Sequence, residues 1–302
     1  MIDGYRVPRR IILSRKGWDS SAGGRPSPIL PDGTLLSLPI PDPESGVKFD
    51  DLQLPNGRKE IGDLVEDLTK RRVHRTHEVH LDPDIRDTAI KRINFQPAFG
   101  QCGGSQSHLE KQGVRKEMAE TDADLFLFFG LYRQVTMSDR WRYVRTAPEI
   151  HVIFAWLQVE KIIRLPEESV PAGLERHPHA IQSGIVRKEL ARLRSKNNTM
   201  YLPRKRLTFR QGMGSGIFAA PFDIRNSQDP RRLSSPSHSK CSLWRLPPFF
   251  AGLSNMGKQP APAEFWEPQR KGFGQEFVLD TQGREIEIEK WLTNLFDTCS
   301  GC

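Results

Sequence analysis

Two runs of apolar residues dominate the hydropathy pattern of the chain. The first is LFLFF at 125–129, inside DADLFLFFGLYR, and the second is VIFAWLQV at 152–159. The first run lacks the polar interruptions of an amphipathic helix, and Gly130 would weaken a helix there. Neither run approaches the roughly 20 apolar residues that are needed to cross a bilayer. The pattern therefore predicts two buried β-strands and no membrane segment.

A basic stretch joins these two predicted strands. In RWRYVR (140–145) arginines alternate with Trp, Tyr or Val. A period of two is typical of a strand with one solvent-exposed face and one packed face. Three consecutive strands favour an antiparallel meander or a small barrel.

Shorter apolar runs predict the other strands. These lie at 9–13, 33–41, 197–203 (NNTMYLP) and 274–280 (GQEFVLD), and the glycine-rich run 213–218 (MGSGIF) is a strand or a turn.

Helical spacing marks a second class of segment. Residues 60–72 place Ile61, Leu64, Val65 and Leu68 on one face. Residues 284–296 do the same with Ile286, Trp291, Leu292 and Leu295. A glycine turn opens a further helix near Ser105, and 185–194 is a short basic helix candidate. Together the patterns predict an α+β fold with an antiparallel core, flanking helices and long loops.

Composition and length indicate the size of the domain, its net charge and the compartment in which we expect the protein. The chain has 302 residues, which suffice for a hydrophobic core, and we expect one domain over 1–302. The 23 prolines and 24 glycines predict long, shaped loops. The formal net charge is 45 − 37 = +8, which favours an anionic partner such as a nucleotide or nucleic acid. The N-terminus shows no signal-peptide pattern, so a cytoplasmic protein is expected.

The cysteines give a weak signal. Cys299 and Cys302 form a C-x-x-C motif without a second pair at zinc spacing. Reduced thiols on a terminal tail are the simpler interpretation, and a metal or redox site is the alternative.

A histidine and aspartate cluster is the first candidate for chemistry. RVHRTHEVHLDPDI (72–85) carries His80, Asp82 and Asp84 at alternate positions. In an extended segment these three side chains share one face, where they could bind a divalent metal or a sugar hydroxyl. A charged loop in which Asp82 closes a turn is the alternative. His177-Pro-His179 is a further metal candidate, with a surface turn as its alternative.

Three other segments could bind an anion or a base. The glycine turn at 99–108 could cradle phosphate and read a base edge through Gln101, or it could be a plain helix cap. The loop with Arg15, Lys16 and Asp19 could close over an anionic ligand or be solvated. Gln275 and Glu276 could face a pocket or solvent at a sheet edge.

These segments together resemble the nucleotide-modification-associated domain 3 family over nearly the whole chain. The segments that carry the resemblance are IILSRKGWDSSAGGRPSPILPDGTLLSLPIP, HLDPDI, FGQCGGSQSHL, ADLFLFFGLYR, HVIFAWLQV, KNNTMYL, SLWRLPP and GQEFVLD. The family occurs in microbial and phage gene neighbourhoods predicted to modify nucleobases. Its polar motif positions correspond here to Ser14, Arg15, Lys16, Asp19, His80, Asp82, Asp84, Gln101, Gln275 and Glu276. This chain departs at Ala123 and Ala155, where glycine is usual, and neither change removes a functional group.

The resemblance implies a protein that acts on or recognises a modified nucleotide or DNA base. Arg15 and Lys16 would hold phosphate, with Ser14, Asp19, Gln101, Gln275 and Glu276 around the nucleotide. Asp82 or Asp84 would serve as a general base or, with His80, as a ligand of a divalent metal. Whether the protein is an enzyme stays open.

The paired apolar strands are also similar to the central strands of PUA-like barrels, which read modified bases. In such a barrel Arg140, Arg142 and Arg145 would line a rim that suits a phosphate backbone. A non-catalytic PUA-like reader of modified nucleic acid is thus one alternative. An enzyme on another small anionic metabolite is the other.

Overall fold

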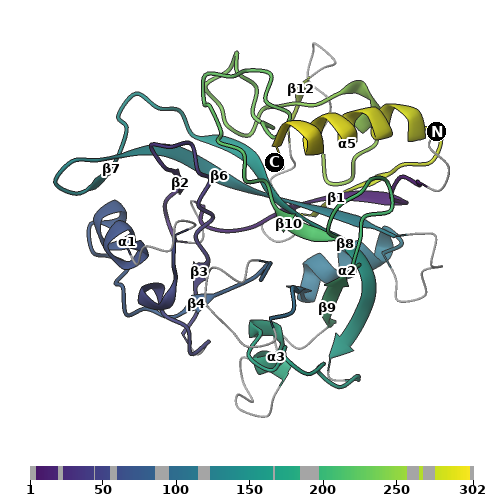
Figure 1. Cartoon of the computed structure of the whole chain (residues 1–302), viewed down its shortest axis with the longest axis horizontal. Coiled ribbons are helices and arrows are strands. Elements are labelled where there is room, and N and C mark those ends of the chain that lie inside the picture. The colour runs from purple at the N-terminus through teal and green to yellow at the C-terminus, as the bar shows by residue number, and fades with distance from the viewer. Residues whose placement is uncertain are drawn as a thin grey trace.

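A curled, mostly antiparallel sheet that forms about half a barrel is the centre of the structure, a computed structural model, and helices pack around it (Figure 1). The α+β prediction is confirmed at this level. The structure describes the residues 5–19, 23–43, 45–54, 60–85, 95–114, 123–165, 167–183, 197–256, 265–267 and 276–299.

Strand β6 (Leu125–Met137) is the central strand of this sheet. β1 (Arg10–Arg15) and β2 (Ser27–Ile29) run parallel along one edge, and β8 (Ile150–Leu165) runs antiparallel along the other. Both apolar runs are therefore strands, and they pair directly, as predicted.

The strand from the basic connector does not lie between these two strands, as it would in a three-stranded meander. β7 (Trp141–Tyr143) pairs with the last residues of β6, beyond the residues of β6 that pair with β8. It lies at one end of the sheet in Figure 1, away from β9.

The sheet continues in the order β13-β1-β6-β8-β9-β5, and β10 also pairs with β8. The bounds of these strands are β5 (Phe99–Gln101), β9 (Asn198–Pro203), β10 (Ser215–Ile217) and β13 (Glu276–Asp280). Two small ladders join β3 (Ile40–Pro41) to β4 (Val79–His80) and β11 (Trp244–Arg245) to β12 (Phe265–Trp266). The strand expected at 33–41 is thus reduced to its last two residues and a single bridge at Leu35.

Four α-helices lie in the described residues. They are α1 (Ile61–Thr69), α2 (Gly103–Lys111), α3 (Pro178–Ser183) and α5 (Glu285–Cys299), and short 3₁₀ turns occur at Phe49–Asp51 and Pro248–Phe250. None of these helices is long and apolar enough to cross a bilayer. The basic helix candidate at 185–194 lies outside the described residues.

Helix α1 follows the sequence pattern closely. Ile61, Leu64, Val65 and Leu68 are all buried, as their spacing predicts. The helix ends where Lys70 adopts a left-handed conformation with φ of 54°.

Helix α5 forms as predicted, but its apolar face is rotated. Ile286 is 67% exposed, whereas Ile288, Leu292 and Leu295 are buried. Spacings of four and three residues from Ile288 continue to Cys299, so the buried stripe starts two residues later than expected. Cys299 is a buried free thiol of this helix and does not belong to a terminal tail. Cys302 lies outside the described residues.

The sheet has a separate apolar core on each face. Ile11 and Leu13 of β1 pack with α5 residues in one cluster, and Ile12 packs with Phe99 and Tyr201 in another. Neighbouring residues of a strand point to opposite faces, so each face of β1 presents a different set of side chains at its end.

Candidate functional site

Asp82 is the centre of the candidate site. It lies in the segment after β4, and its side chain is 3% exposed. The backbone N–H of Gly100 in β5 donates a hydrogen bond to Asp82 Oδ1 at 2.7 Å. Strand β5 therefore holds the carboxylate in place from one side.

Lys16, one residue past β1, supplies a positive charge to this carboxylate. Its Nζ lies 3.6 Å from Asp82 Oδ2 and 4.3 Å from the centre of the Phe99 ring. Burial favours the neutral acid, but the charge of Lys16 and the nearby His177 outweigh it and hold the pKa of Asp82 below its usual value. Asp82 is therefore ionised at neutral pH.

Two histidines at the start of α3 face the same carboxylate. Nε2 of His177 lies 3.5 Å from Asp82 Oδ1, and Nε2 of His179 lies 4.0 Å from Asp82 Oδ2. Both histidines are buried, so the surface-turn interpretation of His177-Pro-His179 is wrong. Pro178 between them suits the first helical position, where its missing N–H leaves no unmade bond.

Gly100 makes room for one of these rings. A Cβ atom built on Gly100 would overlap the His179 imidazole. The glycine of FGQCGG therefore permits β5 to contact both His179 and Asp82. The sequence shows the glycine but not the ring that packs on it.

His80 completes a group of three possible metal ligands. One ligand atom from each of His80, Asp82 and His179 lies within 4.8 Å of the others. The sequence predicted His80 and Asp82 in such a group, with Asp84 as the third member. The structure brings His179 to this place from about a hundred residues away.

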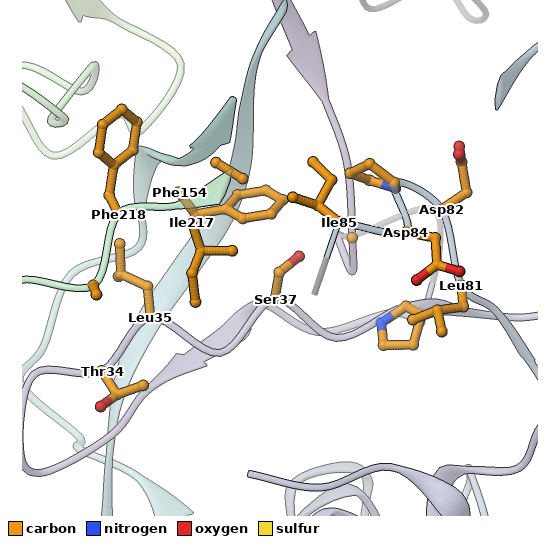
Figure 2. Close-up of a pocket in the computed structure, with 15 residues that line it drawn as sticks. Thr34, Leu35, Ser37, Leu81, Asp82, Asp84, Ile85, Phe154, Ile217 and Phe218 are labelled. Atoms are coloured by element: carbon orange, nitrogen blue, oxygen red, sulfur yellow. The ribbon is translucent and has the colours of Figure 1, made fainter. Parts of the chain in front are cut away.

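Asp84 has a different position. Its backbone exchanges two hydrogen bonds of 2.9 Å with Ala98, and its side chain is buried. The carboxylates of Asp82 and Asp84 point to different sides of the segment that joins them (Figure 2). Both residues nevertheless line one pocket.

The pocket extends from Asp82 and Asp84 to residues of β8 and β10. Together with its open mouth it encloses about 930 Å³. Figure 2 shows Asp82 and Asp84 at one end and Phe154, Ile217 and Phe218 at the other. The pocket thus combines apolar walls with a polar end that accepts hydrogen bonds.

A second carboxylate lies on the same face of β1 as Lys16. Ser14 Oγ donates to Glu276 Oε1 at 3.1 Å, and Gln101 Nε2 donates to the same oxygen. Glu276 Oε2 is buried and has no hydrogen-bond partner within the described ranges. Burial raises the pKa of Glu276, opposed by the charge of Lys16. Glu276 therefore faces the protein interior, while Gln275 lies outside the described residues.

Arg15 and Asp19 lie on the other face of β1. They form an ion pair of 3.0 Å. Beside this pair, burial and then the charge of Arg15 lower the pKa of His151 to about 3. His151 Nδ1 accepts a hydrogen bond from Trp244 Nε1 at 2.9 Å. The residues that the sequence grouped as a phosphate site are thus divided between two faces of the sheet.

The arginines of the basic connector are also remote from Asp82. Arg142 pairs with Asp139 at 2.8 Å on the exposed turn beside β7. Figure 1 places β7 at the end of the sheet opposite to β9 and α3.

Comparison with known proteins assigns the chain to a family. Residues 10–280, from the first residue of β1 to the last of β13, match the family model described as nucleotide modification associated domain 3. No curated protein and no solved structure matches the chain. The family match covers every described strand and each residue around Asp82, so this protein belongs to the nucleotide modification associated domain 3 family.

Proposed function

We propose that the protein acts on a nucleotide or nucleobase bound in the pocket, with Asp82 as the group that contacts the reacting part of the substrate. The observation that carries this proposal is the position of Asp82. Asp82 lines the pocket, and its ionised carboxylate contacts Lys16 and two histidines.

The chemistry of the pocket walls suits a base. Aromatic and aliphatic side chains such as Phe154, Ile217 and Phe218 can pack on the flat faces of a heterocycle. Asp82 and Asp84 accept hydrogen bonds from ring N–H and amino groups, which a nucleobase carries on its edge.

Positive charge supports an anionic substrate. The formal net charge of the chain is +8. Charge of this sign attracts phosphate over long range and would favour a nucleotide over a free base.

The test is mass spectrometry of nucleosides before and after incubation. Free nucleotides and DNA or RNA oligonucleotides, with plain and modified bases, are incubated with the purified full chain. We expect a change of mass in one nucleoside, reduced at least about 100-fold by Asp82→Asn because a charged contact at the reacting group is lost. Asp139→Asn, an exposed carboxylate beside β7, is the matched control and should retain full activity. Equal turnover by Asp82→Asn would refute the assigned role.

A non-catalytic PUA-like reader of modified nucleic acid is the second candidate. Its support is the curled, mostly antiparallel sheet with an apolar pocket against β8 and β10. A reader would leave every nucleoside unchanged and would bind nucleic acid with an affinity that falls steeply with salt. Turnover of a small anion that is not a nucleotide would instead indicate an enzyme on another metabolite.

A further inference from the structure

We propose that His80, Asp82 and His179 bind a divalent cation of the first transition series. Two imidazoles and one carboxylate form a ligand set that such cations prefer, and that leaves coordination positions open for water or substrate. This inference does not rest on the proposed function, because cation binding is measured without any nucleotide.

The three side chains need to move little to bind one ion. One possible ligand atom from each residue already lies within 4.8 Å of the others. Ligands bound to one ion at about 2.1 Å lie about 3 to 3.5 Å apart. A contraction of little more than an ångström would therefore close the three groups around an ion.

The hydrogen bonds behind the two rings orient them for this task. His80 Nδ1 lies 2.8 Å from Asp42 Oδ2, and a carboxylate oxygen accepts, so this ring nitrogen carries the proton. Neutral His80 then has its lone pair on Nε2. A carboxylate behind the ring is the usual outer partner of a metal-bound histidine.

The hydrogen bonds of His179 likewise determine which of its ring nitrogens carries the proton. Asn198 Nδ2 donates to the carbonyl of His179 at 2.8 Å, so Asn198 Oδ1 is the atom that faces His179 Nδ1 at 2.6 Å. His179 Nδ1 must donate to it, and Nε2 is left as the acceptor. Nε2 is also the atom that faces Asp82.

His177 provides a separate sign that a group belongs at this position. The backbone N–H of His179 donates to His177 Nδ1 at 3.3 Å, so the proton of neutral His177 is on Nε2. That atom is buried, faces Asp82 Oδ1 at 3.5 Å and has no hydrogen-bond partner among the described residues. The oxygen of a water or hydroxide bound to the cation would accept a hydrogen bond from this N–H, which assigns His177 a positioning role.

Lys16 is the competitor of the cation. Its ammonium group lies 3.6 Å from Asp82 Oδ2, the oxygen nearest to His179. Like charges repel, so a cation would displace the ammonium group from Asp82. Removing this charge by Lys16→Met should therefore strengthen cation binding, an effect that a purely structural cluster would not show.

Equilibrium dialysis with elemental analysis tests the site. The purified full chain is stripped with a chelator and dialysed against Zn²⁺, Mn²⁺, Co²⁺ or, without oxygen, Fe²⁺. We expect one equivalent of at least one cation per chain. Affinity should fall at least about 10-fold in His179→Gln and Asp82→Asn, and rise in Lys16→Met. His74→Gln/His77→Gln removes two exposed histidines and is the matched control.

The outcomes separate the alternatives. Binding that survives His179→Gln, or that is lost in the His74/His77 control, would overturn the site, as would the absence of a bound equivalent. The Co²⁺ absorption spectrum serves as a second measurement, because loss of a histidine ligand changes it even if a variant is less stable. A protein that binds the cation but leaves nucleosides unchanged would keep this site and refute only the enzymatic role.

Discussion

Gly100 donates its backbone N–H to Asp82 at 2.7 Å and lacks the side-chain atom that would strike the His179 ring. Gly100→Ala should therefore displace His179 or Asp82 and destabilise the protein by about 1 to 3 kcal/mol, as overpacking does. Urea unfolding measures the change. Gly104→Ala is the control, because no described atom outside its chain neighbours and the backbone of its own helix lies within 4 Å of its Cβ position. There alanine should stabilise α2 by about 0.5 to 1 kcal/mol, and equal effects at both positions would contradict the packing argument.

The stability of the protein should depend on both members of the buried ion pair between Lys16 and Asp82. Lys16→Met leaves an uncompensated carboxylate and should cost on the order of 3 kcal/mol in the free energy of unfolding, measured with a chelator present. Adding Asp82→Asn should recover part of this loss, which a double-mutant cycle detects. Arg142→Met at the exposed pair with Asp139 is the control and should change little. Additive effects of the two buried substitutions would show that the charges do not interact.

His151 should make the protein sensitive to acid. Its folded pKa of about 3 lies below the ordinary value of 6.5, so the unfolded chain binds more protons between these values. The stabilising contribution of neutral His151 is complete above pH 6.5 and is lost as the pH falls towards 3. From pH 7 to 4.5 the loss should be about 2 to 3 kcal/mol. His151→Gln, which can still accept from Trp244, should lose less stability over this range in urea unfolding. A slope equal to that of the unmodified protein would argue against a neutral buried imidazole.

Glu276 should make the stability of the protein depend on pH in the opposite direction. Its folded pKa is raised by burial, so the folded chain binds more protons than the unfolded chain above the ordinary pKa of 4.5. The stabilising contribution of protonated Glu276 is complete below pH 4.5 and falls as the pH rises through the pKa of Glu276 in the folded protein. Glu276→Gln keeps an oxygen that can accept from Ser14 and Gln101. Thermal unfolding at pH 8 and pH 4 should show a gain for Glu276→Gln that is larger at pH 8; a larger gain at pH 4 would contradict it.

Local patterns predict most of the regular structure. The apolar runs at 125–129 and 152–159 are strands, and the face of α1 is as its spacing predicts. Hydrophobic periodicity reports whether a segment is buried, and burial determines these elements. The rotated face of α5 shows the limit, because Ile286 fits a helical spacing but the helix packs through a different stripe.

The site is harder to predict because its members are distant in sequence. The HLDPDI segment indicates His80 and Asp82, but nothing local shows that α3 brings His179 to them. One local signal was available: β1 alternates, so Arg15 and Lys16 must lie on opposite faces of the sheet. This alternation alone separates Arg15 from the group around Asp82.

The pairing of β1 with β13 has a consequence for biosynthesis. Ser14 and Glu276 are 262 residues apart, and β13 pairs with β1 at the end of the sheet path. A growing chain emerges from its N-terminus, so the edge of β1 that carries Ser14 stays without β13 until residues 276–280 have been made. Until that moment one edge of β1 is open, and the nascent chain offers that strand to any other unpaired strand nearby.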